Sequence, residues 1–397
     1  MIARLPLVLS VSCLSAFSAP SFYKDVLAVL MERCQTCHRA GEAGPMPLMT
    51  YAQARPWAKA IRDAVATGRM PPWHADSTVL RYRNDLSLTE AQRKILIEWA
   101  ESGAGEGNPK EAPRQKEFAE GWRILKPDAV FPIPESFEVP AEGVLDYQYF
   151  TVATNFTEDK WVEMAEVRPS ARAVVHHAIV SVRAPNEYGW YGGQFLAGYA
   201  PGAAPQIWMP GVARLVPAGS SLLFQMHYTS NGKPASDRTQ IGLKFAKQPP
   251  RERAVAMRAV NSWFVIPPHA GNHVVEASMA VPEPMKLAAI RPHMHLRGKS
   301  FEVTAVFPGG NSQVVLRVPH YDFHWQPYYY LETPILLPAG SRLDCVAEFD
   351  NSRNNARNPN PAEAVRWGEQ SWEEMMIGWF DVLVPAPGRT VSSATRR

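Results

Sequence analysis

Short runs of alternating apolar and polar residues fill the chain from about Leu125 onward. This pattern constrains the possible folds more than any other feature of the sequence. Turn residues separate the runs roughly every 8 to 12 positions, which is typical of antiparallel β-sandwiches. The 36 prolines among 397 residues fit many turns and exclude a protein built of long helices. The clearest expected strands are residues 174–182, 221–229, 240–245, 301–307 and 342–349.

The first hundred residues carry helical spacing instead. We expect one helix over about residues 22–30, a second around 57–65 and a third over 89–102. The third begins with a capping box, formed either by Ser87 with Glu90 or by Thr89 with Gln92. A small all-α unit should therefore precede the β-sandwiches.

Charge and cysteine content exclude two classes of protein. The net charge is only +3, and no basic stripe is interleaved with aromatic residues, so nucleic-acid binding is not expected. Four cysteines cannot staple a chain of this length, which excludes a disulfide scaffold.

The N-terminus has the pattern of a secretory signal. Arg4 precedes an apolar stretch that runs to Phe17, and small residues follow as far as Ala19. We expect residues 1–19 to be removed and the protein to be periplasmic or secreted. A lipoprotein anchor at Cys13 is the alternative. No later stretch is apolar for long enough to predict an integral membrane segment.

A Cys-x-x-Cys-His sequence follows the first expected helix. This spacing attaches haem c covalently through two thiols and places the histidine on the iron. We expect Cys34 and Cys37 to hold one haem, with His38 as an axial ligand. Met70 is the expected second axial ligand and His74 is its rival. A redox dithiol and half of a zinc site are the other interpretations.

The segment around Met70 resembles the loop that supplies the axial methionine in small class I cytochromes c. The resemblance implies a cytochrome c-like domain over residues 20–108. The polar residues that follow, which have no periodic apolar pattern, predict a linker over 109–124.

Histidines carry the second metal-binding signal. His293 and His295 are two residues apart, so on a strand both imidazoles reach the same face. His176 and His177 are adjacent and can share a metal only at a bulge or a strand end. His227 projects from the face of its expected strand opposite the apolar residues. Neutral imidazoles suit copper and zinc.

Four short motifs occur in the order found in the copper type II, ascorbate-dependent monooxygenases, which this chain resembles over roughly residues 125–385. They are His-His, Gln-x-His-Tyr at 225–228, His-x-His and Glu-Glu-Met at 373–375. That family includes peptidylglycine α-hydroxylating monooxygenase and dopamine β-monooxygenase. The resemblance implies two antiparallel, jelly-roll-like β-sandwiches, at 125–249 and 250–385, before a short tail at 386–397.

The resemblance also implies two copper sites of different composition. The copper that stores and donates an electron would be held by His176, His177 and His227. The copper that activates O2 would be held by the catalytic set of His293, His295 and Met375. Two imidazoles and a thioether hold Cu(I), whereas three imidazoles support both oxidation states.

Arg291 matches an arginine that binds the substrate carboxylate in the peptidylglycine enzyme, and a purely structural arginine is the alternative. Ile377 and Trp379 replace the asparagine and tyrosine that complete that site in the enzyme. Peptide amidation is therefore not expected, and the substrate pocket should be more apolar.

The sequence thus predicts an exported copper monooxygenase that hydroxylates an aliphatic C–H bond of a small organic substrate with O2. The expected electron sources are the fused haem, ascorbate or an external donor. A non-catalytic electron carrier or copper-binding protein is the main alternative, and a zinc protein is the third.

Overall fold

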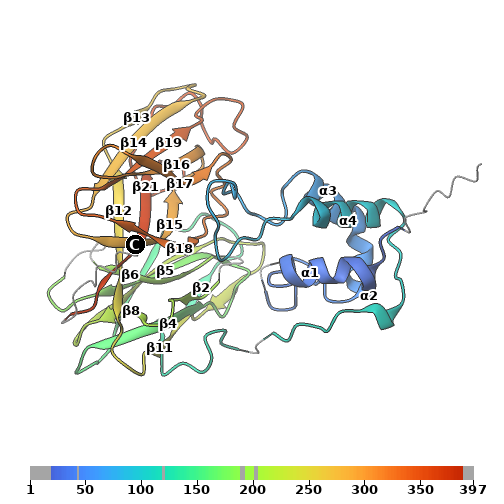
Figure 1. The fold of residues 1–397 in the computed structure, drawn as a ribbon, viewed down its shortest axis with the longest axis horizontal. Coiled ribbons are helices and arrows are strands. Elements are labelled where there is room, and N and C mark those ends of the chain that lie inside the picture. The colour runs from blue at the N-terminus through green and yellow to red at the C-terminus, as the bar shows by residue number, and fades with distance from the viewer. Residues whose placement is uncertain (1–18, 43, 119–120, 188–192, 201–203, 388–397) are drawn as a thin grey trace, which may run out of the picture. The chain divides into compact units, whose positions relative to one another are not determined.

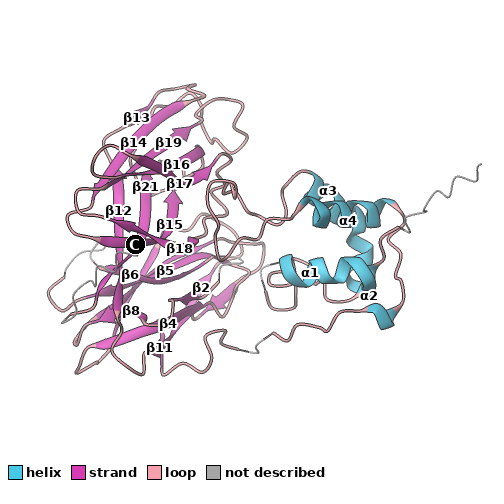
Figure 2. Cartoon of the chain, viewed as in Figure 1, coloured by secondary structure: helices cyan, strands magenta, loops and turns pink. Residues whose placement is uncertain are grey.

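One nine-stranded sheet runs through the whole β-rich part of the chain (Figures 1 and 2). The structure is a computed structural model that describes residues 19–42, 44–118, 121–187, 193–200 and 204–387. In spatial order the strands of this sheet are β1 (Ala129–Pro132), β11 (Gln240–Phe245), β4 (Lys160–Arg168), β8 (Val212–Val216), β12 (Glu252–Asn261), β21 (Met376–Pro385), β15 (Met285–His293) and β18 (Tyr329–Leu337), with β7 (Gln206–Ile207) paired to β4.

Two four-stranded sheets accompany the large one. The first contains β3 (Gln148–Ala153), β9 (Ser221–Tyr228), β5 (Val175–Arg183) and β6 (Gln194–Tyr199). The second contains β14 (His273–Ala280), β19 (Arg342–Phe349), β16 (Gly298–Val306) and β17 (Ser312–Val318). Two short pairs complete the β-structure described: β2 (Phe137–Val139) with β10 (Ala235–Asp237), and β13 (Val265–Ile266) with β20 (Val365–Arg366).

Each four-stranded sheet shares an apolar core with one end of the large sheet. Val180 of β5 and Phe224 of β9 are buried in one core together with Val162 of β4. Phe301 of β16 is buried in the other core together with Phe380 of β21. The alternating pattern read from the sequence is therefore the inward face of each strand.

The two ends of the large sheet join where β8 runs parallel to β12. Arg214 of β8 and Asp381 of β21 form an ion pair across this join at 2.7 Å, and their side chains are only 2% and 4% exposed. The Arg214 guanidinium also lies over the ring of Trp208, 5.3 Å from its centroid. Because both charges are buried, removing either side chain would leave the other charge buried without a counter-charge.

The helical residues form a compact unit made of residues up to 38, 46–71 and 88–116. Its helices are α1 (Leu27–Arg33), α2 (Tyr51–Ala54), α3 (Ala58–Ala66) and α4 (Glu90–Glu101), with shorter helical turns at Phe22–Val26, Arg55–Trp57 and Pro109–Glu111. Phe22, Leu96 and Trp99 are fully buried in its core. Of the two capping boxes considered, the one that forms uses Thr89 and Gln92.

The predicted fold class, a cytochrome c-like all-α domain followed by two sandwiches, is wrong. The structure is mostly β-sheet, and the α-helices of the described residues have only 7, 4, 9 and 12 residues. Residues 39–45 and 72–87, taken from within the expected helical domain, belong to the β-rich unit. A sheet shared by both halves also replaces two separate sandwiches.

Aromatic contacts explain why residues 72–87 belong with the sheets. Tyr82 forms a β-bridge with Leu331 of β18. The ring of Trp73 packs edge-on against those of Tyr82 and Tyr329, at centroid distances of 5.8 and 5.1 Å. These rings bury apolar area against the sheet, which fixes this segment to the β-rich unit.

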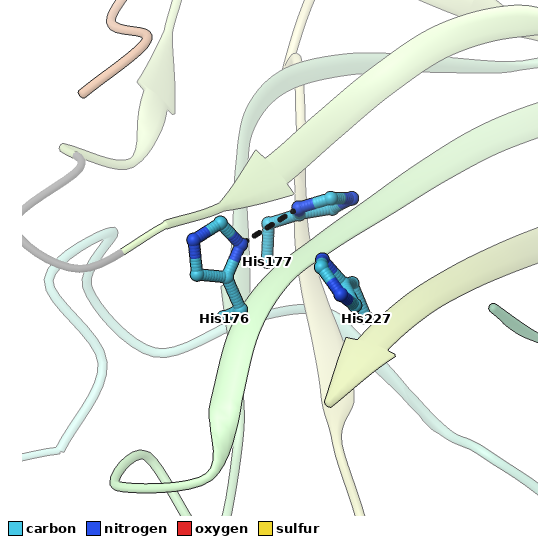
Figure 3. A group of neighbouring side chains, drawn as sticks. All are labelled: His176, His177 and His227. Atoms are coloured by element: carbon cyan, nitrogen blue, oxygen red, sulfur yellow. Dashed lines mark hydrogen bonds between the residues drawn. The ribbon is translucent and has the colours of Figure 1, made fainter. Parts of the chain in front are cut away.

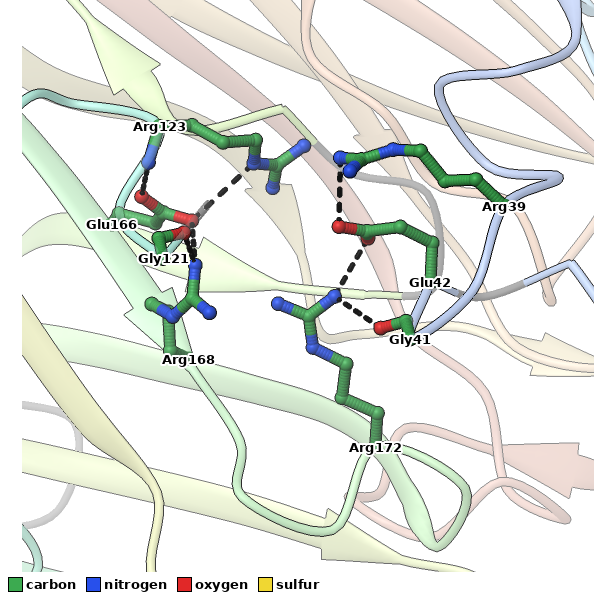
Figure 4. A network of polar contacts seen from close by, with 8 residues as sticks. All are labelled: Arg39, Gly41, Glu42, Gly121, Arg123, Glu166, Arg168 and Arg172. Carbon is green, nitrogen blue, oxygen red and sulfur yellow. Dashed lines mark hydrogen bonds and ion pairs between the residues drawn. The ribbon is translucent and has the colours of Figure 1, made fainter. Parts of the chain in front are cut away.

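Ion pairs explain why residues 39–45 belong to the β-rich unit (Figure 4). The Glu42 carboxylate binds Arg39 at 2.9 Å and Arg172 at 2.6 Å. In the same view, Glu166 of β4 is almost fully buried and binds Arg123, through its backbone N–H at 2.6 Å and its guanidinium at 3.3 Å. Partly buried pairs of this kind fix a loop more firmly than exposed ones.

No helix within the described residues is long and apolar enough to cross a membrane. The expected signal over 1–19 and the tail over 386–397 lie outside the described residues, apart from residues 19, 386 and 387.

We predict that Asp381→Ala lowers the free energy of unfolding of the β-rich unit by about 3–5 kcal/mol, because it leaves Arg214 buried without a counter-charge. Denaturant titration followed by circular dichroism measures this loss. Asp344→Ala removes the partner of the more exposed Arg342 and should cost about 0–1 kcal/mol. Equal losses in the two variants would contradict the role given to the buried pair.

Candidate metal centre

A cavity of about 780 Å³ in the β-rich unit is lined by residues of both expected copper sites. His176 and His177 enter it from β5, and His293 lies on its wall at the end of β15. His295 and Met375 line the same cavity. The fold thus brings together residues that lie as much as 199 positions apart (375 − 176).

The histidines at 176, 177 and 227 form a cluster, which we call the triad. One ring nitrogen from each lies within 4.8 Å of the others (Figure 3). His177 of β5 stands opposite His227 of β9. The strand pairing is irregular between Val175 and His177, so His176 occupies a bulge. A bulge is what two adjacent histidines need to face the same side.

The nitrogens of the triad fit a metal ion. Nδ1 of His176 lies 3.3 Å from Nδ1 of His177. Nδ1 of His227 is buried and has no hydrogen-bond partner in the part of the chain that the structure describes. A buried polar atom without a partner is costly, and a metal bound between the three rings would remove that cost.

Burial keeps the triad imidazoles neutral at neutral pH. Burial, with a smaller contribution from neighbouring histidines, lowers the pKa of His176 and that of His227 to about 4. The pKa of His177 is well below its usual value for the same reasons. A neutral ring keeps the lone pair that a metal requires.

His293, His295 and Met375 all line this cavity, and we call these three residues the pair site. The His293 and His295 ring centroids are 5.2 Å apart. His293 stands opposite Ile377 in the pairing of β15 with β21. Met375 directly precedes β21 and lines the cavity, whereas Met376 is fully buried in the core. Of these two methionines, Met375 is therefore the one placed to bind a metal.

Each histidine of the pair site is oriented through Nδ1. His293 Nδ1 lies 2.6 Å from the side-chain oxygen of Gln326, and His295 Nδ1 lies 3.2 Å from the backbone oxygen of Glu373. A histidine held through Nδ1 can offer Nε2 to a metal, the usual arrangement of metal-binding histidines. The His295 ring also has a backbone hydrogen bond with Gln370. Burial lowers the pKa of His293 to about 3 and that of His295 to about 4.

Glu374 holds the backbone of the pair site. Its carboxylate accepts the N–H of His295 at 2.8 Å and that of Arg297 at 2.6 Å. Burial raises the pKa of Glu374 to about 8, although both N–H groups and the Arg297 charge oppose the rise. In the sequence Glu374 stands out only as part of the Glu-Glu-Met motif, whereas its contacts in the structure give it a positioning role.

Arg291 lies in a row of three side chains across adjacent strands. Trp379 of β21 stands opposite Arg258 of β12 on one side and Arg291 of β15 on the other. All three line the cavity, and the row is two residues along β15 from His293. The Arg291 guanidinium lies 5.5 Å from the ring centroid of Tyr328, and its buried Nε has no partner among the described residues.

The expected haem residues lie in the helical unit. Cys34 follows α1 directly, and its carbonyl accepts the N–H of Cys37 at 3.1 Å and of His38 at 2.9 Å. The Nδ1 of His38 contacts the Met46 carbonyl at 3.1 Å, which leaves Nε2 available for iron. Burial raises the pKa of the Cys34 thiol to about 12. The backbone of Cys34, Cys37 and His38 thus forms one hydrogen-bonded turn after α1.

The two rival axial ligands lie in different units. Met70 belongs to the helical unit and is 39% exposed. His74 belongs to the β-rich unit. Burial lowers its pKa, the Asp322 carboxylate opposes this shift, and the Arg357 guanidinium adds to it. His74 is thus part of the β-rich surroundings rather than of the turn that carries His38.

No protein-family model matches the chain, and no curated protein is significantly similar to it. Among solved structures, the major capsid protein P2 of bacteriophage PM2 matches with 10% identity and a TM-score of 0.31, over 66% of this chain and 100% of its own. The STIV major capsid protein matches with 9% identity and a TM-score of 0.29, over 64% of this chain and 96% of its own. Neither likeness assigns a function to this chain.

We predict that Glu374→Gln lowers the free energy of unfolding by about 1–3 kcal/mol, because an amide N–H₂ would face one of the two buried N–H donors. Urea titration of both proteins measures the difference. Glu373→Gln is the matched control, since its side chain accepts the N–H of Gln370 at 2.9 Å and would keep an acceptor oxygen for it. A control that loses as much stability as Glu374→Gln would count against this role.

Proposed function

We propose that the protein is an exported copper-dependent monooxygenase that hydroxylates an aliphatic C–H bond of a small organic substrate with O2. The observation that carries the proposal is a cavity lined by two imidazoles of a three-imidazole cluster and by a separate set of two imidazoles and a thioether. These donor sets suit two copper ions with different tasks.

Two bound copper ions would supply one-electron chemistry and the activation of O2. The protein would hold one ion through His176, His177 and His227 and the other through His293, His295 and Met375. Gln326 and the Glu373 carbonyl would keep the rings of the pair site turned toward the metal. The cavity would limit water around the reacting C–H bond.

The cavity wall favours an enzyme over a copper store. A store needs ligands alone, whereas this cavity of about 780 Å³ presents aromatic rings and two arginines beside the pair site. Pockets with apolar walls and a few convergent polar groups are typical of small-molecule sites.

The row of Arg258, Trp379 and Arg291 supports a substrate with an apolar body and a carboxylate. The guanidinium groups would bind the anion, and the indole between them would pack on the apolar part. The row is two residues from His293 along the strand, about 7 Å, which leaves space for a few carbon atoms between the carboxylate and the reacting carbon.

We further propose that a haem attached to Cys34 and Cys37 delivers electrons, alone or together with ascorbate or an external donor. The ligand pattern at His38 supports this proposal. Hydroxylation consumes two electrons, and haem is a one-electron carrier. The helical segment that carries this turn is part of the same chain as the cavity.

Metal analysis and isotope labelling test the copper monooxygenase proposal together. We predict two copper ions per chain in the native protein and one in His227→Ala. The reduced, copper-loaded protein is incubated with ¹⁸O₂ and with candidate substrates, each a small carboxylate tested beside the amide of the same carbon skeleton. The product should be heavier than its substrate by one labelled oxygen. Met375→Leu should lower the product yield by about a hundredfold or more, since it removes a ligand of the oxygen-activating site.

His320→Ala is the matched control, because His320 is exposed and lies outside both ligand groups. It should keep two copper ions and full activity. Native protein that binds two copper ions but releases no labelled product would contradict the enzyme and leave the copper-binding alternative.

For the haem, we predict that the fully reduced native protein oxidises its haem at the rate of product formation when mixed with O2 and substrate. Stopped-flow absorbance at the haem bands follows this step. Cys34→Ser with Cys37→Ser should lack covalent haem and, once the electrons stored on its two copper ions are used, form further product only with added ascorbate. Haem that stays reduced while product accumulates would contradict the proposed electron source.

A further inference from the structure

Residues 321–326 lie in the connection between β17 and β18 and contact both ligand groups; we call them the clamp. Tyr321 is the first residue of the clamp. Its hydroxyl donates to the Met294 carbonyl at 2.7 Å and accepts the Met294 N–H at 3.0 Å. Met294 lies between the two histidines of the pair site. A Cβ at Gly298 would lie 2.7 Å from Tyr321, so only glycine allows the ring this close.

Phe323 reaches across to the triad. Its ring stacks on His176 at a centroid distance of 5.8 Å and an angle of 24°. The same ring also packs edge-on against His295, at a centroid distance of 5.8 Å and an angle of 81°. Phe323 is only 6% exposed, so one buried ring lies against a ligand from each group. Packed rings in such a position transmit displacement because close-packed interiors deform little.

Gln326 ties the clamp to the remaining histidine. Its side-chain oxygen pairs with His293 Nδ1 at 2.6 Å, and its amide donates to the Phe323 carbonyl at 2.8 Å. A displacement of Phe323 therefore reaches His293 through one hydrogen-bonded side chain. His324 adds a contact to the triad, with its Nδ1 3.5 Å from Nε2 of His176.

The clamp is braced internally. Asp322 accepts the N–H of His324 at 2.9 Å, and its backbone carbonyl accepts the N–H of Trp325 at 3.0 Å. The Asp322 carboxylate also binds Arg357 through two contacts of 2.8 and 3.0 Å. A segment held in this way moves as a unit.

We infer that Phe323 couples the two ligand groups, so that copper bound by the triad orders the pair site and raises its affinity, and the reverse. Ligation fixes the His176 ring, the ring fixes Phe323, and the clamp then holds His295 and His293 in the orientation that binds metal. The coupling is reciprocal by thermodynamic necessity. Phe323 is a positioning residue in this account, and the inference rests on the proposed copper sites.

Cu(I) binding to the intact chain tests the inference, with a chromophoric chelator as competitor under anaerobic conditions. His227→Ala leaves only the pair site, and His293→Ala with Met375→Leu leaves only the triad. Without coupling, the product of the two affinity constants in the native chain equals the product of the two single-site constants. We expect the native product to be larger by about fivefold or more.

In chains that also carry Phe323→Leu, we expect this excess to vanish while both sites still bind. Phe323→Met, which keeps side-chain volume without a ring, serves if the leucine variant does not fold. Phe323→Tyr keeps the ring and should retain the excess. Phe264→Leu is the control, because it removes one ring from the stack with Phe349, away from both ligand groups.

No excess in the native chain would overturn the coupling, and so would an equal excess with and without the Phe323 ring. Native chain that binds fewer than two copper ions would overturn the proposed copper sites themselves. The two failures are therefore distinguishable in one titration.

Discussion

The antiparallel pairing of β15 with β21 is the constraint on which the candidate site depends. It sets Ile377 opposite His293 and Trp379 opposite Arg291, so the proposed metal-binding end and the arginine row occupy adjacent steps of one sheet. The chain enters β21 through Met375, which places the thioether at the cavity. A shift of this pairing by one residue would turn these side chains to the opposite face.

The two ligand groups share one electrostatic principle. Their imidazoles are removed from water, which lowers the histidine pKa values and keeps the rings neutral. They differ in how the rings are held. The pair site has a partner for Nδ1 of each histidine, whereas in the triad the Nδ1 atoms of His176 and His177 face each other and that of His227 has no partner among the described residues. A bound metal would therefore remove a larger cost of unpaired buried nitrogens in the triad than in the pair site.

Local patterns predicted the strands well, and contacts between distant residues could not be predicted. Alternation gave strands 240–245 and 342–349 with the bounds that β11 and β19 have. The prediction of the fold class was wrong because contacts between distant residues draw parts of the expected helical domain into the β-rich unit. The ion pair of Glu42 with Arg172, for example, joins residues 130 positions apart, and no local sequence pattern indicates it. Phe323 was missed for the same reason, since its partner His176 is 147 positions away (323 − 176). The sequence showed that adjacent histidines would need a bulge, and the irregular pairing before His177 supplies one.

The central claim is that this chain binds two copper ions in chemically different sites, one with nitrogen ligands only and one that includes the Met375 sulfur. Copper K-edge X-ray absorption on the reduced, copper-loaded protein tests it most directly. The account predicts a sulfur scatterer at half an atom per copper in the native protein, absent in Met375→Leu while the nitrogen shell remains. A spectrum with nitrogen ligands only in the native protein, or a sulfur signal unchanged by Met375→Leu, would contradict it.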